Sequence, residues 1–375
     1  MINKLWILVF TALPLSGIAY VLWRTWHILP LPNISKAAIL AVMLLCVLLF
    51  FANFGLFSLD RWPLPLAAAS YDIGTSSIMI LIYAVLLYLL LDLGRALHLV
   101  PHSFVIHSWK GTLTVLLVLT SVFTYGYLHY MHKVRQPLEM KTTKALPKDM
   151  TVVMISDLHL GYSNQVDEFN RWVDLVNAEH PDLILIGGDI IDGHIQPLLQ
   201  QNVAAAFRRL KAPVVACLGN HEYYSGIPGA LQFYHDAGIT LLRDRHVVID
   251  GLNIIGRDDR SNPHRKTLAQ LMQGIDMSRY TILLDHQPYH LEEAERAKID
   301  FQFSGHTHRG QIWPISWITD AVYEDAFGPL QKSGTQYYVS SGIGIWGGKF
   351  RIGTRSEYIV GRLTTTSAQH PGGNH

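Results

Sequence analysis

Cysteine is scarce in this chain: Cys46 and Cys217 are the only two among 375 residues. Cys46 lies in an apolar run and Cys217 in an expected strand, so both a disulfide framework and a cysteine-rich zinc site are excluded. The formal net charge is only +1. The chain therefore lacks the broad basic field that attracts nucleic acid, and we expect no nucleic-acid partner. Nothing in the composition fixes the oligomeric state.

Charged residues are also rare before residue 130, where long apolar runs dominate. Four runs approach the roughly 20 apolar residues that a helix needs to cross a bilayer. They cover residues 5–23, 37–59, 76–93 and 112–130. The first could instead be a cleaved signal peptide, but it is long and lacks a clear small-residue cleavage site. Residues 1–130 are therefore predicted to form a four-helix transmembrane region.

Four spans would place both ends of the chain on one side of the membrane. The Lys and Arg residues on that side are Lys4, Arg61, Lys133, Arg135, Lys141, Lys144 and Lys148. Those on the opposite side are Arg24, Lys36, Arg95 and Lys110. The positive-inside rule then predicts a multi-pass protein of the cell (inner) membrane whose C-terminal domain is cytoplasmic.

Residues 131–149 are polar, contain two prolines and are expected to be a linker. From 150 to 365, strand-like runs alternate with helical periodicity, which predicts an α/β domain with largely parallel strands. The runs at 151–155, 183–186, 214–218, 280–284 and 301–303 are the main strand candidates. Shorter runs at 247–249, 253–255, 337–340 and 358–363 suggest a second sheet. Residues 366–375 are expected to be disordered.

Five polar motifs each follow one of the main strand candidates. They are Asp157-Leu158-His159, Gly188-Asp189, Gly219-Asn220-His221-Glu222, His286 and Gly305-His306-Thr307-His308. Open α/β sheets bind ligands beyond the carboxyl ends of their strands, so we expect these motifs to converge. Carboxylate, amide and imidazole ligands together suit Mn, Fe, Zn or a similar ion. The set is large enough for two divalent metal ions.

The spacing of the ligands suggests how such a site would work. On extended backbone, Asp157 and His159 would point the same way, and the two oxygens of Asp189 could bridge two cations. Two metals about 3.5–4 Å apart provide a bridging hydroxide and clamp a phosphoryl group. His221 is then left to donate a proton or to stabilise charge. Each motif alone is more often structural, but together they favour a metal site.

The order D-x-H, GD, GNH(D/E), H, GHxH resembles the calcineurin-like metallophosphoesterases, over about residues 150–363. The resemblance implies an α/β domain built as a two-sheet β sandwich flanked by helices, with a dinuclear centre. It implies one metal held by Asp157, His159 and His308, a second held by Asn220, His286 and His306, Asp189 as the bridge, and His221 as the catalytic histidine. Residues 342–357 resemble the membrane-associated bacterial, YkuE-like subgroup, which commonly has glycine where this chain has Arg309.

The function expected from these features is hydrolysis of a phosphate ester or pyrophosphate bond, by a phosphodiesterase or pyrophosphatase anchored in the membrane. A lipid or lipid-linked substrate is favoured because the tether keeps the domain near lipids. The alternative is a non-catalytic adaptor on the same fold. Expected spans without acidic–basic pairs at their centres argue against an ion pathway.

Several neighbouring residues allow two interpretations. Asp192 can cap a helix or support the site, and Glu222 can orient His221 or be solvated. Arg309 can contact substrate or lie on an exposed loop. Trp313 and Trp317 can pack in the core or contact the bilayer or an acyl chain, since tryptophan favours membrane interfaces.

Overall fold

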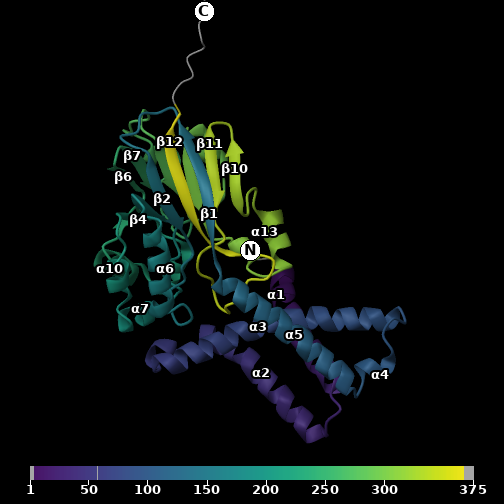
Figure 1. Cartoon of the computed structure of the whole chain (residues 1–375). Helices are drawn as coiled ribbons and strands as arrows, with labels where there is room; N and C mark the ends of the chain where they lie inside the picture. The colour runs from purple at the N-terminus through teal and green to yellow at the C-terminus, as the bar shows by residue number, and fades with distance from the viewer. Residues whose placement is uncertain (1–3, 57, 367–375) are drawn as a thin grey trace, which may run out of the picture. The chain divides into compact units, whose positions relative to one another are not determined.

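The structure, a computed structural model, describes residues 4–56 and 58–366. They form two compact units. The first runs to Leu128 and includes Gly347–Lys349, and the second runs from His129 to Trp346 and resumes at Phe350. The first is helical, and the described strands all belong to the second (Figure 1). The tail expected over 366–375 lies, except for Thr366, outside the described residues.

Among its described residues, the helical unit contains three helices that are long and apolar enough to cross a membrane: α2, α3 and α5. The helices are α1 (Lys4–Ile28), α2 (Asn33–Gly55), α3 (Leu64–Ala96), α4 (His102–Val105) and α5 (Trp109–Met131), with a 3-10 turn, η1 (Leu59–Arg61). This confirms three of the four expected apolar helices. The run at 5–23 lies within α1, whose crossing of the membrane stays a prediction.

Helix α3 has 33 residues and is therefore about 50 Å long, more than the roughly 30 Å of a bilayer core requires. The sequence placed a span only at 76–93, because Ser70, Asp72 and Thr75 interrupt the apolar pattern before it. Near the other end of α3, Asp92 forms an ion pair with the buried Arg24 of α1 at 3.2 Å. The pair lies near the ends of both helices, so it does not mark an ion pathway through their centres.

The second unit is a sandwich of two six-stranded sheets with mixed strand directions. The first sheet has the order β1-β12-β2-β3-β4-β5, and the second has the order β10-β11-β9-β8-β7-β6. The strands of the first are β1 (Lys133–Thr142), β2 (Met150–Ile155), β3 (Leu183–Ile186), β4 (Val214–Ala216), β5 (Thr240–Leu241) and β12 (Ser356–Thr365). Those of the second are β6 (Arg245–Ile249), β7 (Leu252–Gly256), β8 (Thr281–Leu284), β9 (Phe301–Ser304), β10 (Gly328–Lys332) and β11 (Thr335–Val339).

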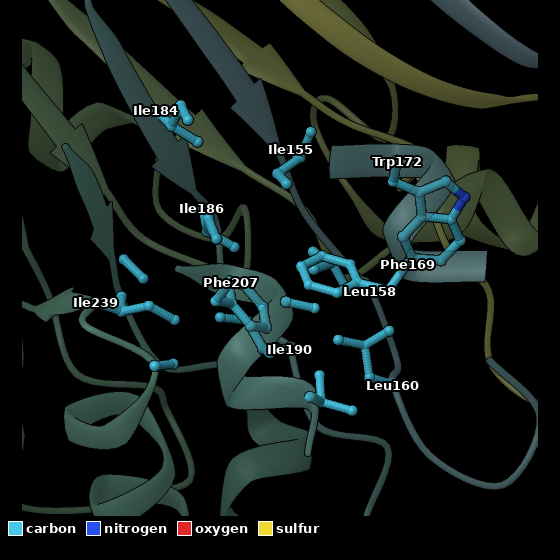
Figure 2. Packing of buried hydrophobic residues seen from close by; sticks show 14 of the residues in the cluster. Ile155, Leu158, Leu160, Phe169, Trp172, Ile184, Ile186, Ile190, Phe207 and Ile239 are labelled. Carbon is cyan, nitrogen blue, oxygen red and sulfur yellow. The ribbon is translucent and has the colours of Figure 1, made fainter. Parts of the chain in front are cut away.

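Three apolar layers hold this unit together. Side chains of both sheets, such as Met154 and Phe303, meet in one buried cluster between the sheets. A second cluster packs helices against the outer face of the first sheet, where Phe207 lies near Ile186 and its ring centroid is 4.3 Å from that of Phe169 (Figure 2). A third covers the second sheet. Because both faces of the central strands are covered, they read as continuous apolar runs. The predicted sandwich with flanking helices is confirmed.

The helices of the second unit are mostly short. They are α6 (Val166–Ala178), α7 (Gln196–Gln200), α8 (Val203–Phe207), α9 (Asn220–Ser225), α10 (Ile227–Asp236), α11 (Leu268–Leu271), α12 (Glu292–Arg296) and α13 (Ile315–Val322), with a 3-10 turn, η2 (His308–Gly310). Short connections of this kind follow the strands and carry the polar motifs toward one edge of the sandwich.

The linker expected over 131–149 is wrong for most of its length. Lys133–Thr142 is strand β1, which pairs in parallel with β12 along all ten residues. Its Leu138 and Met140 are buried in the cluster between the sheets. This strand was missed because it lies at the edge of its sheet. Polar side chains alternate with apolar ones in an edge strand, and proline is tolerated there, so the segment resembles a polar linker. Likewise β12, expected in the second sheet, joins the first between β1 and β2.

We expect Met140→Ala to lower the free energy of unfolding by about 2–5 kcal/mol, because it opens a cavity between the sheets. The matched control, Glu139→Ala on the exposed side of the same strand, should change it by less than about 0.5 kcal/mol. Chemical denaturation of both variants measures the difference. Equal effects would restore the linker interpretation.

Candidate metal centre

The eight predicted site residues meet at one edge of the sandwich, at the carboxyl ends of five strands. Those that follow β2, β3 and β4 of the first sheet are Asp157, His159, Asp189, Asn220 and His221, and those that follow β8 and β9 of the second are His286, His306 and His308. Neither sheet alone supplies the set. The site therefore exists only because the two sheets pack face to face.

One group of ligand atoms comes from Asp157, His159 and His308. The Nε2 atoms of His159 and His308 lie 3.0 Å apart. The Oδ1 atom of Asp157 lies 3.6 Å from Nε2 of His308, and Oδ2 of Asp189 lies 3.7 Å from Nε2 of His159. All four side chains are buried or nearly so.

A second group comes from Asp189, His286 and His306, and Asn220 joins it. Nε2 of His286 lies 3.1 Å from Oδ2 of Asp189 and 3.2 Å from Oδ1 of Asn220. The same amide oxygen lies 2.8 Å from Nδ1 of His306. Oδ2 of Asp189 thus faces both groups, which is the position that a bridging carboxylate needs.

These distances fit bound cations. Ligands at 2.0–2.2 Å from one metal and at right angles to each other are about 3 Å apart, which is the separation found here. The orientations also fit. Nδ1 of His286 can only donate to the carbonyl oxygen of Gly187, at 2.7 Å, so its Nε2 lone pair points to the site. A mixed oxygen and nitrogen set of this kind suits first-row divalent ions.

The charges of the site also favour a bound cation. Burial by itself lowers the pKa of His221, but the carboxylates of Asp189 and Asp192 outweigh it and raise the pKa to about 9. Burial, and then the repulsion of His286, lowers the pKa of His306 to about 4. The buried carboxylates thus attract positive charge, while His306 offers a neutral ring. A cation would satisfy the carboxylates and would be bound by such a ring.

Left-handed backbone aims the ligands. Asp157, His159, Asp189, His306 and His308 have φ angles between 44° and 73°, a region that non-glycine residues rarely adopt and that clusters at functional sites. The prediction that Asp157 and His159 point the same way was based on an extended backbone, and that basis was wrong. They converge because the chain turns after β2.

Close backbone approach requires glycine at two positions. A Cβ atom on Gly305 would lie 2.3 Å from Oδ2 of Asp157, and one on Gly219 would lie 2.1 Å from Oδ1 of Asp189. Both glycines belong to the motifs that the sequence analysis singled out. They let the ligand loops of different strands pack directly onto the carboxylates.

Asp192 and Glu222, for each of which the sequence analysis left two interpretations open, lie behind the site and support it. Nδ1 of His159 lies 3.1 Å from Oδ1 of Asp192, so the ring donates there and its Nε2 faces the site. Glu222 is fully buried, and its carboxylate accepts from the backbone N–H groups of Gly219, Asp189, Ile190 and Ile191 at 2.7–3.2 Å. It locks the loops after β3 and β4 together and does not contact solvent.

Arg351 is a supporting residue that the sequence analysis missed. Its side chain is fully buried and donates to the backbone carbonyl oxygens of His308, at 2.9 Å, and of Ser341, Gly342 and Gly344. Backbone N–H groups of the same segment donate to the carbonyl oxygens of Ser156 and Asp157. The signature at 342–357 thus fastens the loops after β2 and β9. The sequence feature that could have indicated this role is the Arg-x-Gly pattern of Arg351 to Gly353 within a glycine-rich run.

His221 stands at the mouth of a cavity of about 360 Å³. The cavity is lined by Asp189, Asn220, His221, His306, Thr307, His308, Gly310, Gln311, Ile315, Thr319, Tyr323 and Trp346. Nδ1 of His221 lies 3.4 Å from Oδ1 of Asp192, and its ring packs edge-on against that of His159. Arg309 does not line this cavity; its guanidinium lies 4.8 Å above the ring of Phe327.

We expect Asp192→Asn to weaken Mn²⁺ binding by about 10–100-fold, because His159 loses the carboxylate that orients it. Calorimetric titration of the metal-stripped protein measures this. Asp174→Asn, an exposed carboxylate on α6, is the matched control and should leave the affinity unchanged. If Asp192→Asn binds Mn²⁺ as tightly as the wild-type protein, Asp192 has a structural role in its loop and does not orient a metal ligand.

Comparison with known proteins agrees with the geometry. Residues 150–310 match the family model described as calcineurin-like phosphoesterase. An uncharacterized metallophosphoesterase of Helicobacter pylori is 34% identical over 229 residues, which are 58% of this chain and 60% of that protein. The uncharacterized metallophosphoesterase YkuE of Bacillus subtilis is 29% identical, over 66% of this chain and 93% of that protein.

A transmembrane protein with metallophosphoesterase domain from Danio rerio is 27% identical, over 67% of this chain and 62% of its own length. The chain thus spans about three fifths of the Helicobacter relative. The resemblance inferred from the motifs, including the kinship with YkuE, is confirmed. On the order of its motifs and the match over residues 150–310, this part of the chain is similar to the calcineurin-like phosphoesterases.

Proposed function

We propose that this chain is a membrane-anchored phosphoesterase that uses two divalent metal ions to hydrolyse a phosphate ester or pyrophosphate bond. The observation that carries the proposal is the convergence of two ligand groups on Asp189, beside a cavity large enough for a phosphoryl group. Two cations would supply a nucleophile from water at neutral pH and neutralise the phosphoryl oxygens.

The ligand assignment follows the two groups. Asp157, His159 and His308 would hold one ion, Asn220, His286 and His306 would hold the other, and Asp189 would face both. His221 approaches His159 and Asp189 as well, but its side chain is 15% exposed, whereas the rings of His159 and His286 are fully buried. His306 and His308 are also partly exposed, so exposure alone does not decide; we assign His221 to the substrate because it lines the cavity and its Nδ1 atom faces Asp192.

His221 would act on the leaving group. Asp192 faces its Nδ1 atom, so the ring is held with Nε2 free to face the cavity. From there it can donate a proton to the departing oxygen or stabilise negative charge on the phosphoryl group. The carboxylate of Asp192 favours the protonated ring, which is the form that donates.

A lipid or lipid-linked substrate fits the anchoring of the domain. Three helices of the chain are long and apolar enough to cross a membrane, and a tether of this kind keeps a domain at high effective concentration near lipids. The non-catalytic adaptor remains the alternative function, and the experiment below separates the two.

With Mn²⁺, the purified protein should release phosphate or nitrophenol from phosphoesters, and chelation should abolish the activity. We expect His221→Ala to lower kcat by about 10²–10⁴-fold with the metal content unchanged, and Asp189→Asn to lose metal as well. His235→Ala, an exposed histidine on α10, is the control. An inactive wild-type protein, together with a biological role that survives both substitutions, would favour the adaptor.

The same screen tests the lipid substrate. Phospholipids, glycolipid phosphates and lipid-linked nucleotide diphosphates are assayed beside soluble nitrophenyl esters under identical conditions. Cleavage of a phosphate-containing lipid supports the proposal. Cleavage of the soluble esters without turnover of any such lipid contradicts the lipid part and leaves the phosphoesterase part standing.

We further propose that α1 is a fourth span and that residues 1–130, followed by the domain up to residue 365, form a multi-pass protein of the inner membrane with a cytoplasmic domain. The excess of Lys and Arg after α5 supports this orientation. Alkaline phosphatase fused after Lys148 should then be inactive, and an N-terminal tag should be shielded from external protease. An exposed tag with an inactive fusion would mean that α1 does not cross.

A further inference from the structure

Helix α13 exposes a large apolar surface beside the metal centre. Trp317 is 65% exposed, Ile318 59% and Val322 56%. The indole of Trp313 packs edge-on against that of Trp317, with ring centroids 5.3 Å apart. Large apolar side chains grouped in this way on a soluble surface mark a site of interaction.

Other residues of the same helix line the cavity. Ile315 and Thr319, with Tyr323 directly after the helix, line it together with His306 and His308. The spacing i, i+4, i+8 places these three residues on one face. With 3.6 residues per turn, Trp317 lies about 160° around the helix from both Ile315 and Thr319, whereas Ile318 and Val322 lie nearer to the cavity side. Helix α13 therefore lines the cavity with one side and exposes Trp317 on the other, with Ile318 and Val322 exposed between them.

Hydrogen bonds hold α13 in place at both ends. Before the helix, the N–H of Trp313 donates to the carbonyl oxygen of Ile352 at 2.7 Å. Beyond it, the carbonyl oxygen of Ala326 accepts from Thr307 Oγ1 at 2.6 Å. Thr307 lies between the predicted ligands His306 and His308. The exposed apolar surface is thus fixed relative to the metal centre.

We propose that the exposed face of α13 docks onto the boundary between headgroups and acyl chains of the bilayer, so that the cavity receives the phosphate headgroup of a lipid from that same bilayer. Tryptophan with aliphatic neighbours is the composition that favours this boundary. This inference rests on the proposed phosphoesterase function and adds the surface that selects membrane-bound substrates.

The chain itself argues for a bilayer as the occupant of this face. A single residue, His132, separates α5, which is apolar and long enough to cross a membrane, from strand β1. So short a tether keeps the domain within reach of the membrane surface at all times. Asp320 is the one charged residue of α13, so the docking is apolar and does not require anionic lipids.

Contact with lipid is measured directly in the full-length protein, reconstituted in phosphatidylcholine nanodiscs. Trp317→Cys, in a Cys46→Ser background, is labelled with a polarity-sensitive fluorophore; the fully buried Cys217 should not react. The control position is Leu199→Cys, since Leu199 is another exposed apolar residue on α7 of the same unit. Lipids with a spin label high on the acyl chain then act as quenchers.

We expect about threefold or greater quenching at position 317 relative to position 199, because only the former lies within the interface. Equal and weak quenching at the two positions overturns the proposal. Self-association that Trp317→Ser abolishes, without any quenching in nanodiscs, would also overturn it by assigning the face to a second copy of the chain.

The consequence for catalysis is measured with two esters of the same chemistry in the same nanodiscs: methyl nitrophenyl phosphate, which is soluble, and hexadecyl nitrophenyl phosphate, which enters the bilayer. Trp317→Ser combined with Ile318→Ser should reduce turnover of the hexadecyl ester about tenfold, through lost effective concentration, and leave the methyl ester unaffected. Leu199→Ser is the matched control. Equal loss on both esters contradicts a docking role. A wild-type protein that cleaves neither ester refutes the diesterase form of the proposed function, while the quenching still decides docking.

Discussion

The burial of two carboxylates among imidazoles is the constraint on which this site depends. Asp157 and Asp189 are almost fully buried, and a buried carboxylate is costly unless positive charge and hydrogen bonds compensate it. The structure provides some of this compensation through backbone N–H groups, since His306 donates to Asp157 and His221 to Asp189, each at 2.9 Å. The proposed cations would supply the rest, which accounts for the candidate ligands that surround the carboxylates from both sheets.

Strain in the backbone is the cost of that convergence. Asp157, His159, Asp189, His306 and His308 occupy left-handed conformations, each of which costs of order 1–3 kcal/mol and persists only where the surroundings enforce it. The enforcing groups are identifiable. Glu222 ties two ligand loops together, Asp192 fixes the ring of His159, and Arg351 fastens the loop of His308 to the C-terminal segment. The buried charged side chains of Glu222, Asp192 and Arg351 thus hold the loops that carry the buried carboxylates of the site.

The same edge of the sandwich combines chemistry with placement. Helix α13 contributes Ile315 and Thr319 to the cavity and also exposes Trp317 and Ile318. Burial of Trp317 and Ile318 in a membrane interface would be favourable, because it would remove their apolar surface from water. With the proposed docking, a substrate within the bilayer would reach the cavity more readily than a soluble one.

The sequence by itself singled out the candidate ligand residues, and it determined the apolar helices α2, α3 and α5 and the sheets' main strands. These follow from local patterns: a polar motif directly after an apolar run, or an uninterrupted apolar stretch. Only the tertiary structure decided that residues 133–142 form strand β1, that β12 lies in the first sheet, and that Asp192, Glu222 and Arg351 support the ligands. The physical reason is that these features depend on partners far away along the chain. Lys133 pairs with Ser356, and Arg351 donates to His308, so no local pattern could record either contact.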